Sequence, residues 1–128
     1  GGIRSFRENN DTSNMHFFLN FEPEDYGRLI ANAECIIGNS SSGLREGAFL
    51  GIPCVNVGSR QAGRERAANV ADVPNDASKI LEAARKQIAH GKYERDTLVG
   101  DGTAGIQMAD ILATVPLDVQ KKIHYIYE

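Results

Sequence analysis

The feature that most constrains the fold is the alternation of short apolar runs with longer amphipathic runs along this chain of 128 residues. The short runs predict strands at residues 15–19, 35–37, 53–57 and 68–73, and the longer runs predict helices at residues 23–33, 44–50, 77–90 and 105–113. Strands that alternate with helices form βαβ units, in which the strands are parallel and helices cover both faces of the sheet. We therefore predict an α/β fold with a three-layer, Rossmann-like parallel sheet.

The predicted helices are recognised by their end signals and by the spacing of their apolar residues. Pro23 opens the first of them, Asp76 precedes the helix at 77–90 as a cap, and Gly91 ends it. The apolar positions on one side are Ile80, Leu81, Ala84 and Ile88 in that helix, and the apolar positions of the last helix are Ile106, Ala109, Ile111 and Leu112. Both helices are therefore expected to be amphipathic.

Composition excludes several classes of protein. The chain has 14 Lys and Arg against 17 Asp and Glu, a net charge of −3, and 41% hydrophobic residues, which are ordinary values for one globular domain. It has no basic stripe of the kind that binds nucleic acid, so no nucleic-acid partner is expected. No apolar stretch approaches the roughly 20 residues that a membrane helix needs, and no signal-peptide pattern is present. We expect a cytoplasmic protein without a membrane partner.

We expect residues 1–115 to form one domain and residues 116–128 to form a C-terminal tail. The first residue is Gly1 rather than Met, which favours a part of a longer protein. Cys35 and Cys54 both lie among apolar residues, and this setting predicts two buried, reduced thiols rather than a disulfide.

A cluster of small polar residues follows the strand predicted at 35–37. The run from Asn39 to Gly43 reads Asn-Ser-Ser-Ser-Gly and precedes a helix, whose start offers free N–H groups and a partial positive charge to an anion. Three hydroxyls can add hydrogen bonds to phosphate oxygens, and Gly43 permits close approach. Ser residues are also ordinary helix caps, but three of them beside two glycines favour an anion site.

Two further features complete the predicted site. Glu46 lies in the helix that follows and suits the hydroxyls of a ribose, although a solvated helix charge would have the same sequence signature. The loop at 58–66 follows the next strand and contains Arg60, Arg64 and Arg66, and Arg suits bidentate binding of phosphate. A solubilising surface loop is the alternative. Together the two loops favour a diphosphate ligand.

Neither a metal nor a cofactor is expected. His16, His90 and His124 are scattered and show no metal-ligand spacing. The sequence has no Walker A pattern and no G-x-G-x-x-G, so a P-loop NTPase or a dehydrogenase is not supported. No pair of catalytic carboxylates and no Ser/His/Asp set is found, which indicates that the chain carries only half of an active site.

The residues from Gly38 to Glu46 and from Gly51 to Glu65 resemble UDP-N-acetylglucosamine 2-epimerases, in particular the hydrolysing branch that feeds sialic acid synthesis. The shared pattern is GNSS-x-G-x-RE followed by G-x-P-x-x-N-x-G-[ST]-RQ-x-GRE, and a weaker similarity extends over residues 3–115. The SDSGG and TERPE patterns of the non-hydrolysing branch are missing. The resemblance implies the C-terminal half of a GT-B fold, in which two Rossmann-like domains bind a UDP-sugar between them.

The resemblance also implies a reaction and a set of residues. UDP is eliminated from UDP-N-acetylglucosamine to leave a glycal, to which water adds to give N-acetylmannosamine. The implied UDP site consists of Phe21, Asn39, Ser40, Ser41, Glu46 and Arg60, with Tyr26, Ser42, Gly43, Gln61 and Arg64 as further candidates. Arg4 and Arg7 have the spacing of two regulatory arginines that bind a feedback inhibitor in bifunctional relatives. Catalytic residues are expected on the missing N-terminal domain, so the chain alone is expected to be inactive. The full-length protein is expected to be a homo-oligomer.

Two alternatives stay open at this point. A GT-B glycosyltransferase would share the UDP site but pass the sugar to an acceptor. A non-catalytic module would use the same fold only to assemble with a partner.

Overall fold

The computed structural model describes residues 2–116 of the chain. Within this range the centre is a parallel sheet of three strands, β1 (Ile36–Gly38), β2 (Cys54–Val57) and β3 (Val70–Val73), in the order β1-β2-β3. Ile36 pairs with Cys54, and Cys54 pairs in turn with Val70, so all three strands end at one edge of the sheet. The predicted α/β class with a parallel sheet is confirmed.

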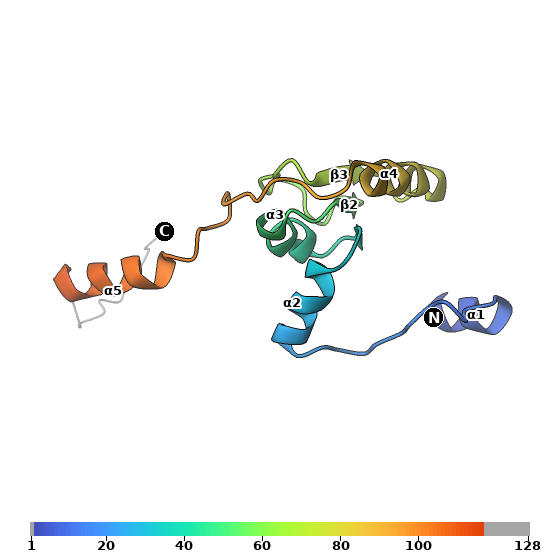
Figure 1. Ribbon diagram of the computed structural model, residues 1–128, viewed down its shortest axis with the longest axis horizontal. Helices are drawn as coiled ribbons and strands as arrows, with labels where there is room; N and C mark the ends of the chain where they lie inside the picture. Colours follow the sequence, from blue (N-terminus) through green and yellow to red (C-terminus); the bar gives the residue numbers. More distant parts are fainter. Residues whose placement is uncertain (1, 117–128) are drawn as a thin grey trace, which may run out of the picture.

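Helices pack against this sheet, and helical segments connect β1 to β2, whereas a loop connects β2 to β3 (Figure 1). A short 3-10 helix, η1 (Ser41–Gly43), lies against β1 and β2 and leads into α3 (Glu46–Leu50). Helix α4 (Ala77–His90) packs against β2 and β3, and α2 (Pro23–Ala31) packs against α3. The helices α1 (Gly2–Asn9) and α5 (Ala104–Thr114) lie at the two ends of the drawn chain, away from the sheet.

The core is centred on β2 and the residues just before it. Ile52, Cys54 and Val55 are fully buried, and Leu44 and Ala48 pack beside them. A strand with a neighbour on each side and cover from helices reads as a continuous apolar run, which is the pattern that predicted β2 from the sequence. β2 is therefore the buried central strand of the sheet, and the loops that carry the candidate site begin where the strands end.

The strand predicted at residues 15–19 is wrong. These residues form no strand, and Phe18 and Leu19 are exposed. A strand needs a neighbour for its backbone hydrogen bonds, and no strand of the described residues pairs with this segment. Its apolar side chains instead make local contacts, such as that of Phe17 under the guanidinium of Arg7.

Several element boundaries also differ from the prediction. Helix α3 begins at Glu46 rather than at 44, because the 3-10 turn of η1 takes up the preceding residues. Strand β3 is limited to Val70–Val73, α2 ends at Ala31, and α1 was not predicted. The cap at the start of α4 is confirmed, since the Asp76 carboxylate accepts a hydrogen bond of 3.0 Å from the Lys79 N–H.

The apolar spacing of the last two helices was a poor guide to what they bury. In α4, Ala84 and the polar Gln87 are buried, whereas Leu81 is 52% exposed although it lies on the predicted side. Helix α5 forms as predicted but buries none of its residues, and Ile111 is 60% exposed. The predicted tail lies outside the described residues from 117 onward.

Both cysteines are free thiols, as predicted, but only Cys54 is buried and Cys35 is half-buried. Burial raises the pKa of the Cys54 thiol to about 12, with a further contribution from nearby Cys35. Among residues 2–116 no helix has both the length and the apolar character needed to cross a membrane.

Candidate functional site

The loops that follow β1 and β2 are joined into one surface at the carboxyl edge of the sheet. The Gln61 side chain, 4% exposed, donates a hydrogen bond of 2.7 Å from Nε2 to the backbone oxygen of Asn39. Gln61 therefore links the Arg-containing loop to the Ser-containing loop. The carboxyl ends of parallel strands are where open α/β sheets bind ligands.

The three serines have different surroundings. The N–H of Ser42 donates to the Ser40 Oγ over 3.3 Å, and the two hydroxyls lie 3.0 Å apart. The Ser42 hydroxyl also makes a 2.7 Å hydrogen bond with the Tyr26 hydroxyl, and Ser42 is buried. Ser42 thus holds η1 against α2, whereas Ser40 is exposed and Ser41 is half-buried at the surface.

Packing against the sheet gives a structural reason for a glycine at position 43 that the sequence did not indicate. A Cβ atom at this position would overlap the Sγ of Cys54 on β2. The absence of a side chain therefore allows η1 to pack directly on the sheet, and the role of Gly43 in close approach to a ligand stays a prediction.

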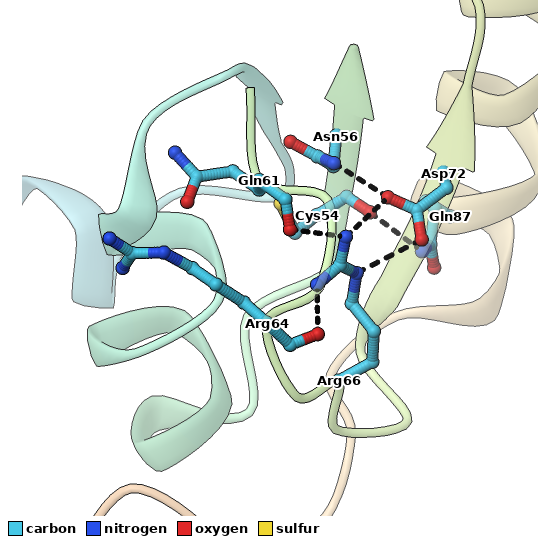
Figure 2. A network of polar contacts seen from close by, with 7 residues as sticks. All are labelled: Cys54, Asn56, Gln61, Arg64, Arg66, Asp72 and Gln87. Atoms are coloured by element: carbon cyan, nitrogen blue, oxygen red, sulfur yellow. Dashed lines mark hydrogen bonds and ion pairs between the residues drawn. The ribbon is translucent and has the colours of Figure 1, made fainter. Parts of the chain in front are cut away.

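The charged candidates lie at the surface around these loops. Glu46 is the first residue of α3 and is exposed, and Arg60 and Arg64 are exposed on the loop at 58–66. Figure 2 shows the Arg64 side chain extending away from the hydrogen-bond network beneath the loop. All three side chains are therefore accessible to a ligand at this edge.

An aromatic cluster lies next to the Ser-containing loop. The ring centroid of Phe21 is 4.7 Å from that of Phe18 and 6.3 Å from that of Tyr26. Because Tyr26 is hydrogen-bonded to Ser42, Phe21 is connected to the predicted site through one intervening residue. The structure thus places Phe21 and Tyr26 beside the same loop.

Arg4 and Arg7 are not brought to this edge. Both lie on α1, which Figure 1 shows apart from the sheet and from α3. Arg4 pairs with Glu8 at 2.9 Å, and the Arg7 guanidinium lies 4.7 Å from the centroid of the Phe17 ring. The structure therefore gives their predicted regulatory role no connection to the strand-end loops.

A polar network beneath the loops was missed by the sequence analysis (Figure 2). Asn56 of β2 donates from Nδ2 to the Asp72 carboxylate over 2.6 Å, and Arg66 Nε donates to the same carboxylate over 3.0 Å. The hydrogen bond from Arg66 is the main cause that holds the pKa of Asp72 below its usual value. A polar Asn in the middle of the buried run Cys54–Val57 was the available signal.

A second buried layer of amides supports the sheet from below the site. Asn69 Nδ2 donates to the backbone oxygens of Gly43 and Ile52 at 3.0 and 2.8 Å. Gln87 Nε2 donates to the backbone oxygens of Cys54 and Asn69, both at 3.0 Å. These bonds satisfy carbonyl groups that are otherwise costly to bury. Within residues 2–116, no group of three or more His, Cys, Asp or Glu side chains is arranged to hold a metal.

Comparison with known proteins identifies the family. A family model described as UDP-N-acetylglucosamine 2-epimerase matches residues 3–113. The match covers both strand-end loops and the sheet between them, and it extends over most of the chain. This chain belongs to the UDP-N-acetylglucosamine 2-epimerase family.

Individual relatives agree with this assignment. The chain is 40% identical over 91 residues to UDP-N,N'-diacetylbacillosamine 2-epimerase (hydrolyzing) of Legionella pneumophila, covering 71% of this chain and 24% of that protein. It is 38% identical over 84 residues to GDP/UDP-N,N'-diacetylbacillosamine 2-epimerase (hydrolyzing) of Campylobacter jejuni, covering 62% and 22%. It is 31% identical over 74 residues to UDP-N-acetylglucosamine 2-epimerase of Neisseria meningitidis, covering 58% and 20%. The chain therefore spans a quarter or less of these relatives.

Proposed function

We propose that this chain is the UDP-binding part of a hydrolysing UDP-N-acetylglucosamine 2-epimerase. In the proposed reaction, the bond between sugar C1 and the diphosphate breaks, UDP leaves, and a proton is lost from C2 to form a glycal. Water then adds to the glycal and gives N-acetylmannosamine. The observation that carries the proposal is the Gln61–Asn39 hydrogen bond, which joins the Ser-containing and Arg-containing loops in a chain of this family.

We assign the ligand contacts according to the surroundings of each residue. The exposed or half-buried Ser40 and Ser41, together with Arg60, would contact the diphosphate, whose developing charge as a leaving group needs donors already in place. Glu46 would accept hydrogen bonds from the ribose, and the backbone near Phe21 would face the uracil. Of the further candidates, Arg64 and Tyr26 lie beside the loops, whereas Ser42, Gly43 and Gln61 act within the protein.

The rest of the active site belongs to the part of the protein outside this chain. We propose that residues 1–115 are part of the C-terminal domain of a GT-B fold, followed by the tail at 116–128. The acid and base residues would come from the N-terminal domain, so the chain alone should release no N-acetylmannosamine. The homo-oligomeric state of the longer protein, its cytoplasmic location and its place in the synthesis of sialic-acid-type sugars remain predictions.

A second candidate substrate is a UDP-2,4-diacetamido sugar. One relative is named for UDP-N,N'-diacetylbacillosamine and another for GDP/UDP-N,N'-diacetylbacillosamine, rather than for UDP-N-acetylglucosamine. The two substrates share UDP and the 2-acetamido group and differ at C4 and C6 of the sugar. The UDP contacts assigned here serve either substrate.

The proposal is tested by removing two ligand contacts that lie outside the core. Ser41→Ala combined with Arg60→Ala should weaken UDP binding at least about tenfold, since hydrogen bonds to charged groups are worth about 1.5–3 kcal/mol each. Thermal unfolding should be unchanged, because both side chains are at the surface. An unchanged affinity for UDP in the double variant would refute the site assignment.

A further inference from the structure

Arg66 makes an unusual set of contacts for a residue at the end of a surface loop (Figure 2). Its Nε donates to Asp72 Oδ2 at 3.0 Å, and one terminal nitrogen donates to the backbone oxygen of Gln61 at 2.9 Å. The other terminal nitrogen donates to the backbone oxygen of Arg64. The Arg66 side chain is only 26% exposed. One guanidinium thus connects two points of the loop at 58–66 to strand β3.

The partner of Arg66 is itself fixed in the sheet. Asp72 lies on β3, and its carboxylate accepts a second hydrogen bond from Asn56 on β2. Asn56 is 1% exposed, so this bond is made from a side chain that cannot move freely. A series of hydrogen bonds therefore connects the buried Asn56 on β2, through Asp72 and Arg66, to the backbone of the loop at 58–66.

The two bonded carbonyls lie next to the arginines of the proposed site. The carbonyl of Gln61 directly follows Arg60, and the second carbonyl belongs to Arg64 itself. Gly58 and Gly63 have φ values of 77°, so the loop contains two turns of a kind that favours glycine. A loop with two glycine turns and exposed cationic side chains needs a separate constraint to hold those charges in one place.

We propose that Arg66 is a positioning residue for the diphosphate, acting through the carbonyls of Gln61 and Arg64 to hold Arg60 and Arg64 over the strand ends. This inference rests on the proposed function, because it takes the ligand to be the diphosphate of a UDP-sugar. In this role Arg66 acts through the loop rather than by contact with the ligand, and each of its three nitrogens donates a hydrogen bond within the protein. The affinity for the diphosphate then depends on Arg66, whose side chain lies beneath the loop at 58–66.

The geometry requires arginine rather than any cation. A guanidinium presents donors in a planar fork and reaches a carboxylate and two carbonyls at once, whereas a lysine ammonium is a point charge on a flexible stem. Arg66→Lys should therefore keep the charge and the apolar stem but lose the connection to the loop. This variant separates positioning from simple electrostatic attraction.

The test compares Arg66→Met and Arg66→Lys with a matched control. Arg85→Met removes the same charge from an exposed position on α4 that makes no ion pair among residues 2–116. The first readout needs no ligand and is the amide hydrogen exchange of residues 59–65. In both Arg66 variants the amide hydrogens of this loop should exchange faster, while those of β2 should exchange at the rate of the wild type. Arg85→Met should match the wild type in both regions. Unchanged loop exchange in both Arg66 variants would overturn the proposal.

The second readout is the affinity for UDP. Arg66→Met and Arg66→Lys should each weaken binding by about tenfold, the order expected when a contact residue is misplaced. Combined with Arg60→Ala, the additional loss from Arg66→Met should fall clearly below its loss in the wild type, because one of the two residues that Arg66 positions is already gone. Full additivity would overturn the positioning role. If the wild type binds no UDP, the proposed function fails, while the exchange data still decide whether Arg66 fixes the loop.

Discussion

Helices α4 and α5 show the same kind of sequence pattern but have different fates in the structure. Helix α4 packs on β2 and β3, buries Ala84, and sends Gln87 to the backbone of the sheet. Helix α5 has the higher apolar content of the two, yet it buries none of its residues. Periodicity thus predicted both helices, but it did not indicate which one would be part of the core.

The difference shows that polar side chains define the packed region as much as apolar ones. Gln87 and Asn69 reach carbonyls at the ends of strands, whereas the side-chain hydrogen bonds of α5 within residues 2–116 are made inside the helix or to its N-cap residue Thr103. The proposed site lies at the edge of this packed region, which consists of the sheet with η1, α3 and α4, and its loops are held by contacts to the sheet. The predictions below test this comparison, starting with the largest expected effect.

Gly51→Ala should strongly destabilise the packed region. Gly51 has φ 67°, and a Cβ there would overlap the backbone oxygen of Tyr93. Strain of the left-handed conformation and overpacking together should lower the free energy of unfolding by about 3 kcal/mol, measured by urea denaturation. Gly105→Ala in α5 is the matched control, because a Cβ there meets nothing. Equal losses in both variants would abolish the distinction between the two regions.

Gln87→Leu should have the next largest effect. The change removes three hydrogen bonds, two that Gln87 Nε2 donates to the backbone oxygens of Cys54 and Asn69 and one that Gln87 Oε1 accepts from the Tyr93 hydroxyl. Their loss should cost about 2 kcal/mol in the free energy of unfolding. Gln107→Leu changes an exposed glutamine of α5 whose side chain, among residues 2–116, bonds to Thr103, and it should stay within about 0.5 kcal/mol of the wild type. A neutral Gln87→Leu variant would contradict the role given to the buried amides.

The Cys54 thiol should make stability depend on alkaline pH. Its pKa is about 12 in the folded chain, above the ordinary thiol value of 9.0, because burial disfavours the thiolate. The unfolded chain therefore loses this proton first, so the contribution is complete below pH 9 and is lost as the pH rises toward 12. The stability difference between wild type and Cys54→Ala should shrink over that range. A difference that is constant with pH would contradict this expectation.

Ile111→Ser should have the smallest effect. Ile111 is exposed in α5, so the free energy of unfolding should change by less than about 0.5 kcal/mol. Thermal unfolding of the two chains at equal concentration would measure it. A loss comparable with that of Gln87→Leu would show that α5 is packed in solution and that its contrast with α4 is not real.

The sequence predicted the parts that depend on contacts between nearby residues and the strand at the centre of the core. The apolar run of β2, the Asp76 cap and the positions of the two loops followed from patterns within a few residues. The segment at 15–19 was predicted as a strand because its apolar pattern is indistinguishable from that of a paired strand. Whether a neighbouring strand exists is not encoded in such a run.

The site was predictable in part for the same reason. Ser40, Ser41 and Arg60 stand in loops whose composition is visible in the sequence. The Gln61–Asn39 bond that joins those loops spans 22 residues, and the Asn56–Asp72 bond beneath them, between β2 and β3, spans 16, so no local pattern contains either bond. Gln61 was a further candidate for ligand contact, and its hydrogen bond to the Asn39 backbone is a role that the sequence did not indicate.

The central claim is that this region carries a site for uridine diphosphate, and calorimetric titration of the chain with UDP tests it most directly, with ADP as the control. Both nucleotides carry the same diphosphate and ribose, which we propose are bound by the Ser-containing loop, Arg60 and Glu46, and they differ only in the base, which we propose lies near Phe21. The account predicts that UDP binds in preference to ADP. Equal affinity for the two nucleotides, or no binding of UDP, would contradict it.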